Sequence, residues 1–128
     1  YQFKLPAAPY VAKEETTISL PYLKEKKEYL SSLCDILVIE GAGGLLVPLE
    51  EDLFIIDLIK EFKAQAILIT PSKLGCINDT LLSIEALKSR NIDFEFYINL
   101  YEDKDSFEKV SKPFLQNHFK KLLFLDEL

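Results

Sequence analysis

Short apolar runs rich in β-branched residues alternate along this sequence with longer stretches of helical periodicity. The clearest runs cover residues 36–39 and 66–69, and two further strands are predicted over residues 94–99 and 122–125. Continuously apolar strands without a polar face are typical of parallel sheets that helices cover on both sides. The sequence therefore predicts an α/β fold, built as a parallel sheet with crossover helices.

Helical periodicity fills the segments between these runs. Proline fits the first turn of a helix, so Pro21 marks the start of one helix before residue 36. The spacing of apolar residues predicts further helices over residues 51–62, 77–90 and 105–119. Pro113 should bend the last of these helices or delay its start, because proline lacks the N–H that a helix interior needs.

Charge and cysteine content exclude several classes of protein. The net charge of −6 disfavours a nucleic-acid partner, which needs a concentrated basic face. Cys34 and Cys76 show no Cys-x-x-Cys spacing, so neither a disulfide scaffold nor a structural zinc site is expected. No apolar run approaches the roughly 20 residues of a membrane helix. We expect a cytoplasmic protein whose residues 1–128 form a single domain without a membrane partner.

A glycine-rich loop follows the first apolar run directly, in the order Glu40, Gly41, Ala42, Gly43, Gly44. In open parallel sheets ligands bind beyond the carboxyl ends of the strands. Glycines let backbone N–H groups approach a phosphate, and a neighbouring carboxylate can hold a divalent cation. A plain strand-end turn would contain the same glycines, but the acidic residue at the strand end favours a nucleotide-related site.

Two other strand ends carry weaker signals. Residues 74–80 lead into a helix start, which could bind a carboxylate or phosphate, although simple capping by Asn78 or Asp79 is favoured on this pattern alone. Asn99 could pair with a purine edge or could form a turn. His118, the only histidine, has no triad partners beside it and is interpreted as an ordinary helix residue. No residue is predicted to act as a covalent catalyst.

In order and spacing, three segments of the sequence resemble the dethiobiotin synthetase family. They are Phe-Lys-Leu-Pro-Ala-Ala-Pro-Tyr at residues 3–10, Asp-Ile-Leu-Val-Ile-Glu-Gly-Ala-Gly-Gly at 35–44 and Gly-Cys-Ile-Asn-Asp-Thr-Leu-Leu at 75–82. The second motif is shared with other amide-forming ATP ligases, whereas the third is more particular to this family. The resemblance implies a P-loop NTPase-like fold, of which residues 1–128 are the carboxy-terminal portion.

The resemblance also implies a reaction, cofactors and a set of site residues. The reaction is ATP-dependent closure of a ureido ring from 7,8-diaminononanoate and CO2 in biotin biosynthesis, with Mg²⁺ as cofactor. By resemblance, Glu40 binds Mg²⁺ and the nucleotide, Gly41 and Gly43 lie against the phosphates, and Asn99 binds adenine. The implied substrate contacts are Pro6, Gly43, Gly75, Cys76, Ile77 and Asn78, with the helix start acting across a homodimer interface.

One family motif does not occur in this sequence. Family members carry a phosphate-binding loop of the Gly-x-x-x-x-Gly-Lys-Thr type, and no stretch of residues 1–128 has that spacing. We therefore expect these residues alone to lack ligase activity. Two alternatives remain: a non-catalytic dimerisation or regulatory module, and a cobyrinate-type amidoligase, against which the match at residues 75–78 argues.

Overall fold

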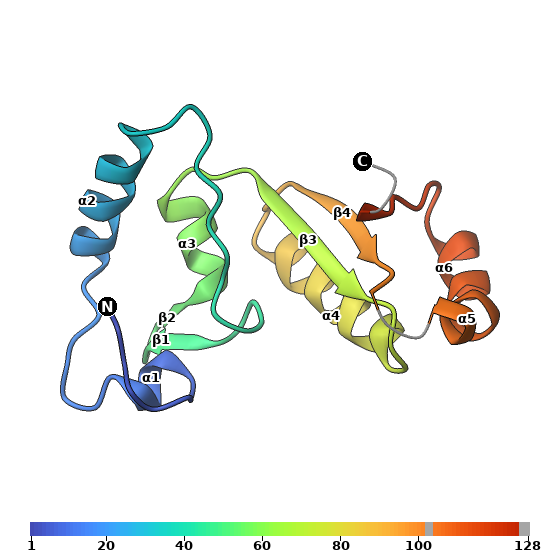
Figure 1. The fold of residues 1–128 in the computed structure, drawn as a ribbon, viewed down its shortest axis with the longest axis horizontal. Helices are drawn as coiled ribbons and strands as arrows, with labels where there is room; N and C mark the ends of the chain where they lie inside the picture. Colours follow the sequence, from blue (N-terminus) through green and yellow to red (C-terminus); the bar gives the residue numbers. More distant parts are fainter. Residues whose placement is uncertain (102–103, 126–128) are drawn as a thin grey trace. The chain divides into compact units, whose positions relative to one another are not determined.

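The computed structural model describes residues 1–101 and 104–125, and the chain divides into two compact units, residues 1–64 and 65–128 (Figure 1). The first unit contains α1 (Pro9–Ala12), α2 (Leu20–Ser31), β1 (Pro48–Glu50), β2 (Leu53–Phe54) and α3 (Ile55–Glu61). The second contains β3 (Ala66–Pro71), α4 (Cys76–Ser89), β4 (Phe94–Asn99), α5 (Lys104–Ser106), the π-helical segment η1 (Phe107–Ser111) and α6 (Lys112–His118). Among the described residues, no helix is long and apolar enough to cross a membrane.

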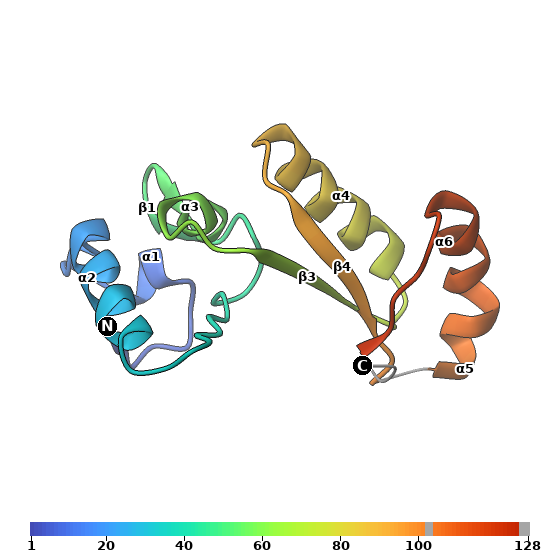
Figure 2. The same ribbon diagram turned by 90° about the horizontal axis from the view of Figure 1, so that it is seen from above.

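The second unit is built around a parallel strand pair. β3 and β4 pair from Ala66 opposite Phe94 to Pro71 opposite Asn99. The helix α4 connects them and packs against β3 (Figure 2). The core beside this pair consists of buried side chains from four elements, namely Cys76, Ile98, Phe107 and Leu115. The arrangement confirms the predicted parallel sheet with a crossover helix, and the predicted bounds of both strands and of α4 agree closely with the structure.

The last helix shows the effect of Pro113. Lys104 to His118 form one helical stretch, whose middle part, η1, is a π-helix that ends immediately before α6. Because Pro113 cannot donate a backbone hydrogen bond to the preceding turn, a local widening of the helix relieves the mismatch. The predicted strand at residues 122–125 is shorter than expected. It consists of a single parallel bridge between Phe124 and Ile98, whose N–H donates to the Leu123 carbonyl over 2.8 Å.

In the first unit, α2 begins where the sequence predicted and α3 begins later. The Ser19 hydroxyl accepts the Tyr22 N–H and so caps α2, with Pro21 in the first turn. The prediction that this helix starts at residue 51 was wrong, because residues 51 and 52 form the turn of an antiparallel hairpin between β1 and β2. Ile55 is the first residue of α3, and the Asp57 carboxylate accepts the Phe54 N–H over 2.8 Å.

The predicted strand at residues 36–39 is also wrong. These residues form no strand, and the side chains of Ile36 and Val38 are 81% and 85% exposed. A parallel strand requires backbone partners on a neighbouring strand and apolar cover on its faces. Within the first unit, β1 and β2 pair with each other in a two-stranded sheet. An apolar run thus identifies residues that favour a strand, but it does not supply the partner that a strand needs.

Candidate functional site

The carboxyl ends of β3 and β4 bring two of the predicted site segments to one edge of the second unit. Pro71 and Asn99 are register partners at the ends of the two strands, and Asn99 is exposed. A short loop leads from Pro71 to the start of α4 at Cys76 (Figure 2). Asn99 and the helix start therefore both follow the carboxyl ends of paired parallel strands, where ligands bind in open α/β sheets.

The start of α4 depends on Gly75. This residue is the N-cap, with a φ of +95° that side-chain-bearing residues rarely adopt. The Cys76 N–H donates to the Lys73 carbonyl over 3.1 Å, and the Asp79 N–H donates to the Gly75 carbonyl over 3.3 Å. Among the described residues, no side chain forms a capping hydrogen bond to this helix start, so the capping interpretation of Asn78 and Asp79 is wrong. Both lie inside the helix, where the Asn78 amide donates to the Asp79 carboxylate over 3.2 Å.

The residues of this helix start differ in what they can offer a ligand. Gly75 and Asn78 are exposed, Ile77 is half-buried against the core, and Cys76 is fully buried within it. The Cys76 thiol therefore faces the core, and no part of this residue is at the surface. A first helical turn carries N–H groups without carbonyl partners from the helix and the positive end of the helix dipole. This geometry suits a carboxylate.

The glycine loop of the first unit has structural constraints of its own. A Cβ added to Gly41 would lie 2.8 Å from the Ile55 Cγ2 atom, and one added to Gly43 would lie 3.0 Å from the Val47 Cγ2 atom. Gly43 also has a φ of +81°. The fold therefore requires both glycines before any ligand is considered, as the plain-turn interpretation predicts. Glu40 is exposed beside them.

A magnesium ion can use few protein ligands. The described residues contain no group of three or more His, Cys, Asp or Glu side chains that could hold a metal. Mg²⁺ is commonly held by one or two carboxylates, with phosphate oxygens and waters completing its octahedron. The single exposed carboxylate of Glu40 fits that donor set, whereas it would not suffice for a site built from protein ligands alone.

Pro6 lies in the same unit as Glu40. It is exposed at the centre of a three-residue turn, in which the Ala7 N–H donates to the Leu5 carbonyl over 2.9 Å, just before α1. The predicted site residues thus form two groups. One, with Pro6 and the loop at residues 40–43, belongs to the first unit, and the other, with residues 75–78 and Asn99, belongs to the second.

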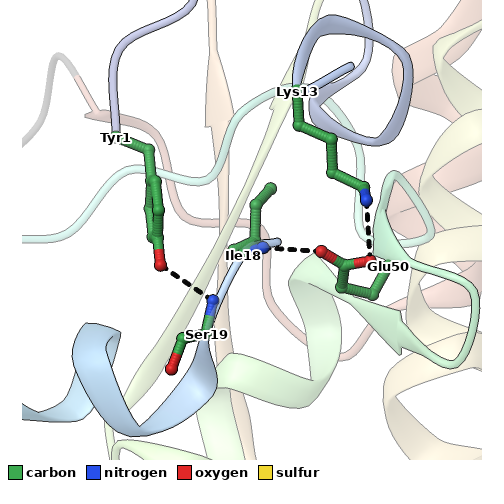
Figure 3. Close-up of polar contacts among 5 residues, drawn as sticks. All are labelled: Tyr1, Lys13, Ile18, Ser19 and Glu50. Atoms are coloured by element: carbon green, nitrogen blue, oxygen red, sulfur yellow. Dashed lines mark hydrogen bonds and ion pairs between the residues drawn. The ribbon is translucent and has the colours of Figure 1, made fainter. Parts of the chain in front are cut away.

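A polar network around Glu50 was missed from the sequence (Figure 3). Its carboxylate accepts the Ile18 N–H over 2.6 Å and pairs with the Lys13 ammonium over 2.9 Å. The Ile18 N–H first, and then Lys13, hold the pKa of the Glu50 carboxyl below its ordinary value. Glu50 also lines an open pocket of about 460 Å³. Residues more than 30 apart form this network, so no local pattern could reveal it.

A second missed feature is a pair of buried threonines. The Thr70 and Thr80 hydroxyls lie 2.5 Å apart, and the two residues are 3% and 2% exposed. Thr70 belongs to β3 and Thr80 to α4. The pair thus joins the strand to the helix on either side of the loop that contains Gly75.

Comparison with known proteins gives consistent matches. The model of a family described as an AAA domain matches residues 1–112. An ATP-dependent dethiobiotin synthetase from a Sulfurovum species is 59% identical over 114 residues, covering 89% of this chain and 54% of the relative. The Wolinella succinogenes protein of the same name is 41% identical over 128 residues, covering 98% of this chain and 59% of that relative. The chain spans about half the length of these relatives, and the similarity confirms the resemblance predicted from the motifs.

Proposed function

This chain belongs to the AAA domain family, which is of the P-loop NTPase type, and on that premise we propose that it is part of an ATP-dependent dethiobiotin synthetase. The observation that carries the proposal is the 59% identity to the Sulfurovum enzyme over 114 residues. The substrates would be 7,8-diaminononanoate, CO2 and ATP. Since the reaction consumes ATP, we assign it to the cytoplasm.

The chemistry of such a reaction needs positioned groups more than a covalent catalyst. CO2 adds to one amine of the substrate as a carbamate, and ATP transfers a phosphoryl group to a carbamate oxygen. The second amine then attacks the carbamate carbon, and inorganic phosphate leaves as the ureido ring closes. A protein assists these steps by holding the two amines and the phosphates in line and by neutralising the negative charge that develops.

In this proposal, the loop of the first unit faces the phosphates. Glu40 would provide one carboxylate oxygen to Mg²⁺, which supplies positive charge to the phosphate oxygens when bound. The exposed position of Glu40 at the head of the glycine loop supports this role. Gly41 and Gly43 would present backbone without side chains, and Asn99 would pair with adenine through its exposed amide.

The start of α4 would bind the substrate carboxylate. Gly75, Ile77 and Asn78 would contribute backbone N–H groups and the helix dipole, and the buried Cys76 would hold this turn in place from the core. Pro6 and Gly43 would line the substrate chain. A homodimer would place this helix start against the active site of the neighbouring subunit. The 80% exposure of Leu74, beside the helix start, supports the presence of a covering partner there.

Isothermal titration calorimetry with 7,8-diaminononanoate tests the proposal. We expect this chain to bind the diamine and not acetate. The variant Asn78→Asp should bind about five- to ten-fold more weakly, because its carboxylate repels that of the substrate at the helix start. The matched control is Asn91→Asp, which makes the same change just beyond the other end of α4 and should leave the affinity unchanged.

Other outcomes of this titration would reject the proposal. Binding of cobyrinate in place of the diamine would indicate a cobyrinate-type amidoligase. Absence of small-molecule binding would indicate a non-catalytic dimerisation or regulatory module. Equal affinities of the Asn78→Asp and Asn91→Asp variants would reject the assignment of the helix start to the substrate carboxylate.

A further inference from the structure

The threonine pair is polar where an apolar pair would suffice. Thr70 and Thr80 lie between β3 and α4, each almost completely buried. A buried hydroxyl without a partner is costly, and two valines of the same shape would fill this space without needing one. Among the described residues, no buried side-chain nitrogen or oxygen lacks a hydrogen-bond partner. The hydroxyls are therefore satisfied, and what distinguishes them from valines is the directional bond that joins them.

The hydrogen bond between Thr70 and Thr80 links the end of β3 to the first part of α4, and so closes the loop that contains the helix start. Thr70 is the next-to-last residue of β3, and Thr80 lies about one turn into α4. Between them run the loop and the left-handed Gly75. On another side, the buried Cys76 anchors the same turn in the core with Ile98. The first turn of α4 is thus held at two points. The buried Cys76 side chain keeps the turn packed against the core, and the directional Thr70–Thr80 hydrogen bond opposes rotation or translation of the helix relative to β3.

Resting on the proposed function, we infer that Thr70 and Thr80 are positioning residues for the substrate carboxylate. Neither hydroxyl is at the surface, so neither touches the substrate. The bond between them fixes the height and rotation of the α4 start relative to the end of β3, and hence the direction of the N–H groups of Gly75, Ile77 and Asn78. Hydrogen bonds weaken steeply with misalignment, so a small displacement of this turn lowers carboxylate affinity.

Three variants of the 128-residue chain separate positioning from packing. Thr80→Val removes one hydroxyl and leaves the buried Thr70 hydroxyl without that partner, so it should lower both stability and affinity for 7,8-diaminononanoate. Thr80→Ser keeps the hydroxyl and should retain the affinity. The double variant Thr70→Val/Thr80→Val buries two apolar groups of the original shape, so its stability should match or exceed that of the parent chain. Its affinity should nevertheless be about ten-fold weaker in calorimetry, because the directional bond is absent.

Amide hydrogen exchange provides a readout that does not depend on ligand binding. In the double variant, the Cys76 and Asp79 amides, which donate within the helix start, should exchange about ten-fold faster than in the parent chain. Amides in the middle of α4 should be unchanged.

The two readouts separate the inference from the function on which it rests. A double variant with parental affinity and parental exchange would overturn the positioning role and leave only packing. If the parent chain itself fails to bind the diamine, the proposed function fails. The exchange rates then decide alone whether the hydroxyl pair orders the helix start: faster exchange supports that ordering, and parental exchange overturns it.

Discussion

Replacing Gly41 with alanine should destabilise the first unit through one identifiable contact. The new Cβ would lie 2.8 Å from the Ile55 Cγ2 atom, whereas carbon atoms in contact are normally about 3.5–4.0 Å apart. Ile55 cannot easily move away. Its Cγ2 is fixed by branching at Cβ, and its N–H donates to the Val47 carbonyl over 3.1 Å. Either Gly41 or the start of α3 must therefore shift.

The size of the effect follows from two opposing contributions. Overpacking of this kind costs about 1–3 kcal/mol. Replacing glycine by alanine also restricts the unfolded chain, which stabilises the fold by about 0.4–1 kcal/mol. The net loss for Gly41→Ala should be about 0.5–2 kcal/mol. Gly44→Ala is the matched control, since a Cβ there would have no neighbour within 4 Å in the part of the chain that the structure describes, and Gly44 does not have a positive φ. It should be neutral or slightly stabilising.

The assay is native-state hydrogen exchange at the Ile56 amide, which donates to the Leu45 carbonyl over 2.9 Å within the first unit. Ten-fold faster exchange corresponds to about 1.4 kcal/mol, so Gly41→Ala should accelerate this amide by roughly two- to thirty-fold. Adding Ile55→Leu removes the β-branch and should recover part of the loss. The steric explanation is wrong if the double variant loses as much stability as the two single variants together. It is also wrong if Gly44→Ala destabilises the first unit as much as Gly41→Ala does.

Three further predictions concern other parts of the chain. Gly75→Ala should lower the free energy of unfolding by about 1–2 kcal/mol in urea titrations, from its left-handed backbone alone. It should also slow diaminononanoate binding in stopped-flow mixing. Phe107→Ala should cost about 3–5 kcal/mol in urea titrations because the ring is 1% exposed, whereas truncating the 42% exposed Phe114 should cost much less. The folded-state pKa of Glu50 is lowered, so its stabilising contribution is complete above the ordinary glutamate pKa and is lost as the pH falls through the folded value. Glu50→Gln should lower the melting temperature at neutral pH and flatten its dependence on acid pH.

The second unit could be predicted well because its signals are local. The run that became β4 was bounded correctly, and the run that became β3 began at the right residue but ended two residues early. The effect of Pro113 follows from a single missing N–H. The first unit was harder. The apolar run that includes Ile36 and Val38 satisfies every residue preference of a buried strand, yet it is exposed, because strand formation also depends on a partner. The hairpin of β1 and β2 has strands too short to leave a periodic pattern.

The candidate site shows the same division. Gly75 stood out in the sequence, and its positive φ explains why glycine is needed there. The sequence could not show that Cys76 faces the core instead of a ligand, since burial depends on residues that follow it much later, such as Phe107. Nor could it show that Thr70 bonds to Thr80, because hydroxyl-bearing residues at that spacing carry no pattern of their own.

The central claim is that this chain is part of an ATP-dependent dethiobiotin synthetase. Its most direct test is incorporation of ¹⁴C-bicarbonate into dethiobiotin by the purified complete product of the gene that encodes this chain, with ATP, Mg²⁺ and 7,8-diaminononanoate present. We expect labelled dethiobiotin that depends on ATP and is lost when Glu40 is replaced by glutamine, and no product from residues 1–128 alone. ATP-independent label, or no dethiobiotin from the complete product, would contradict the claim.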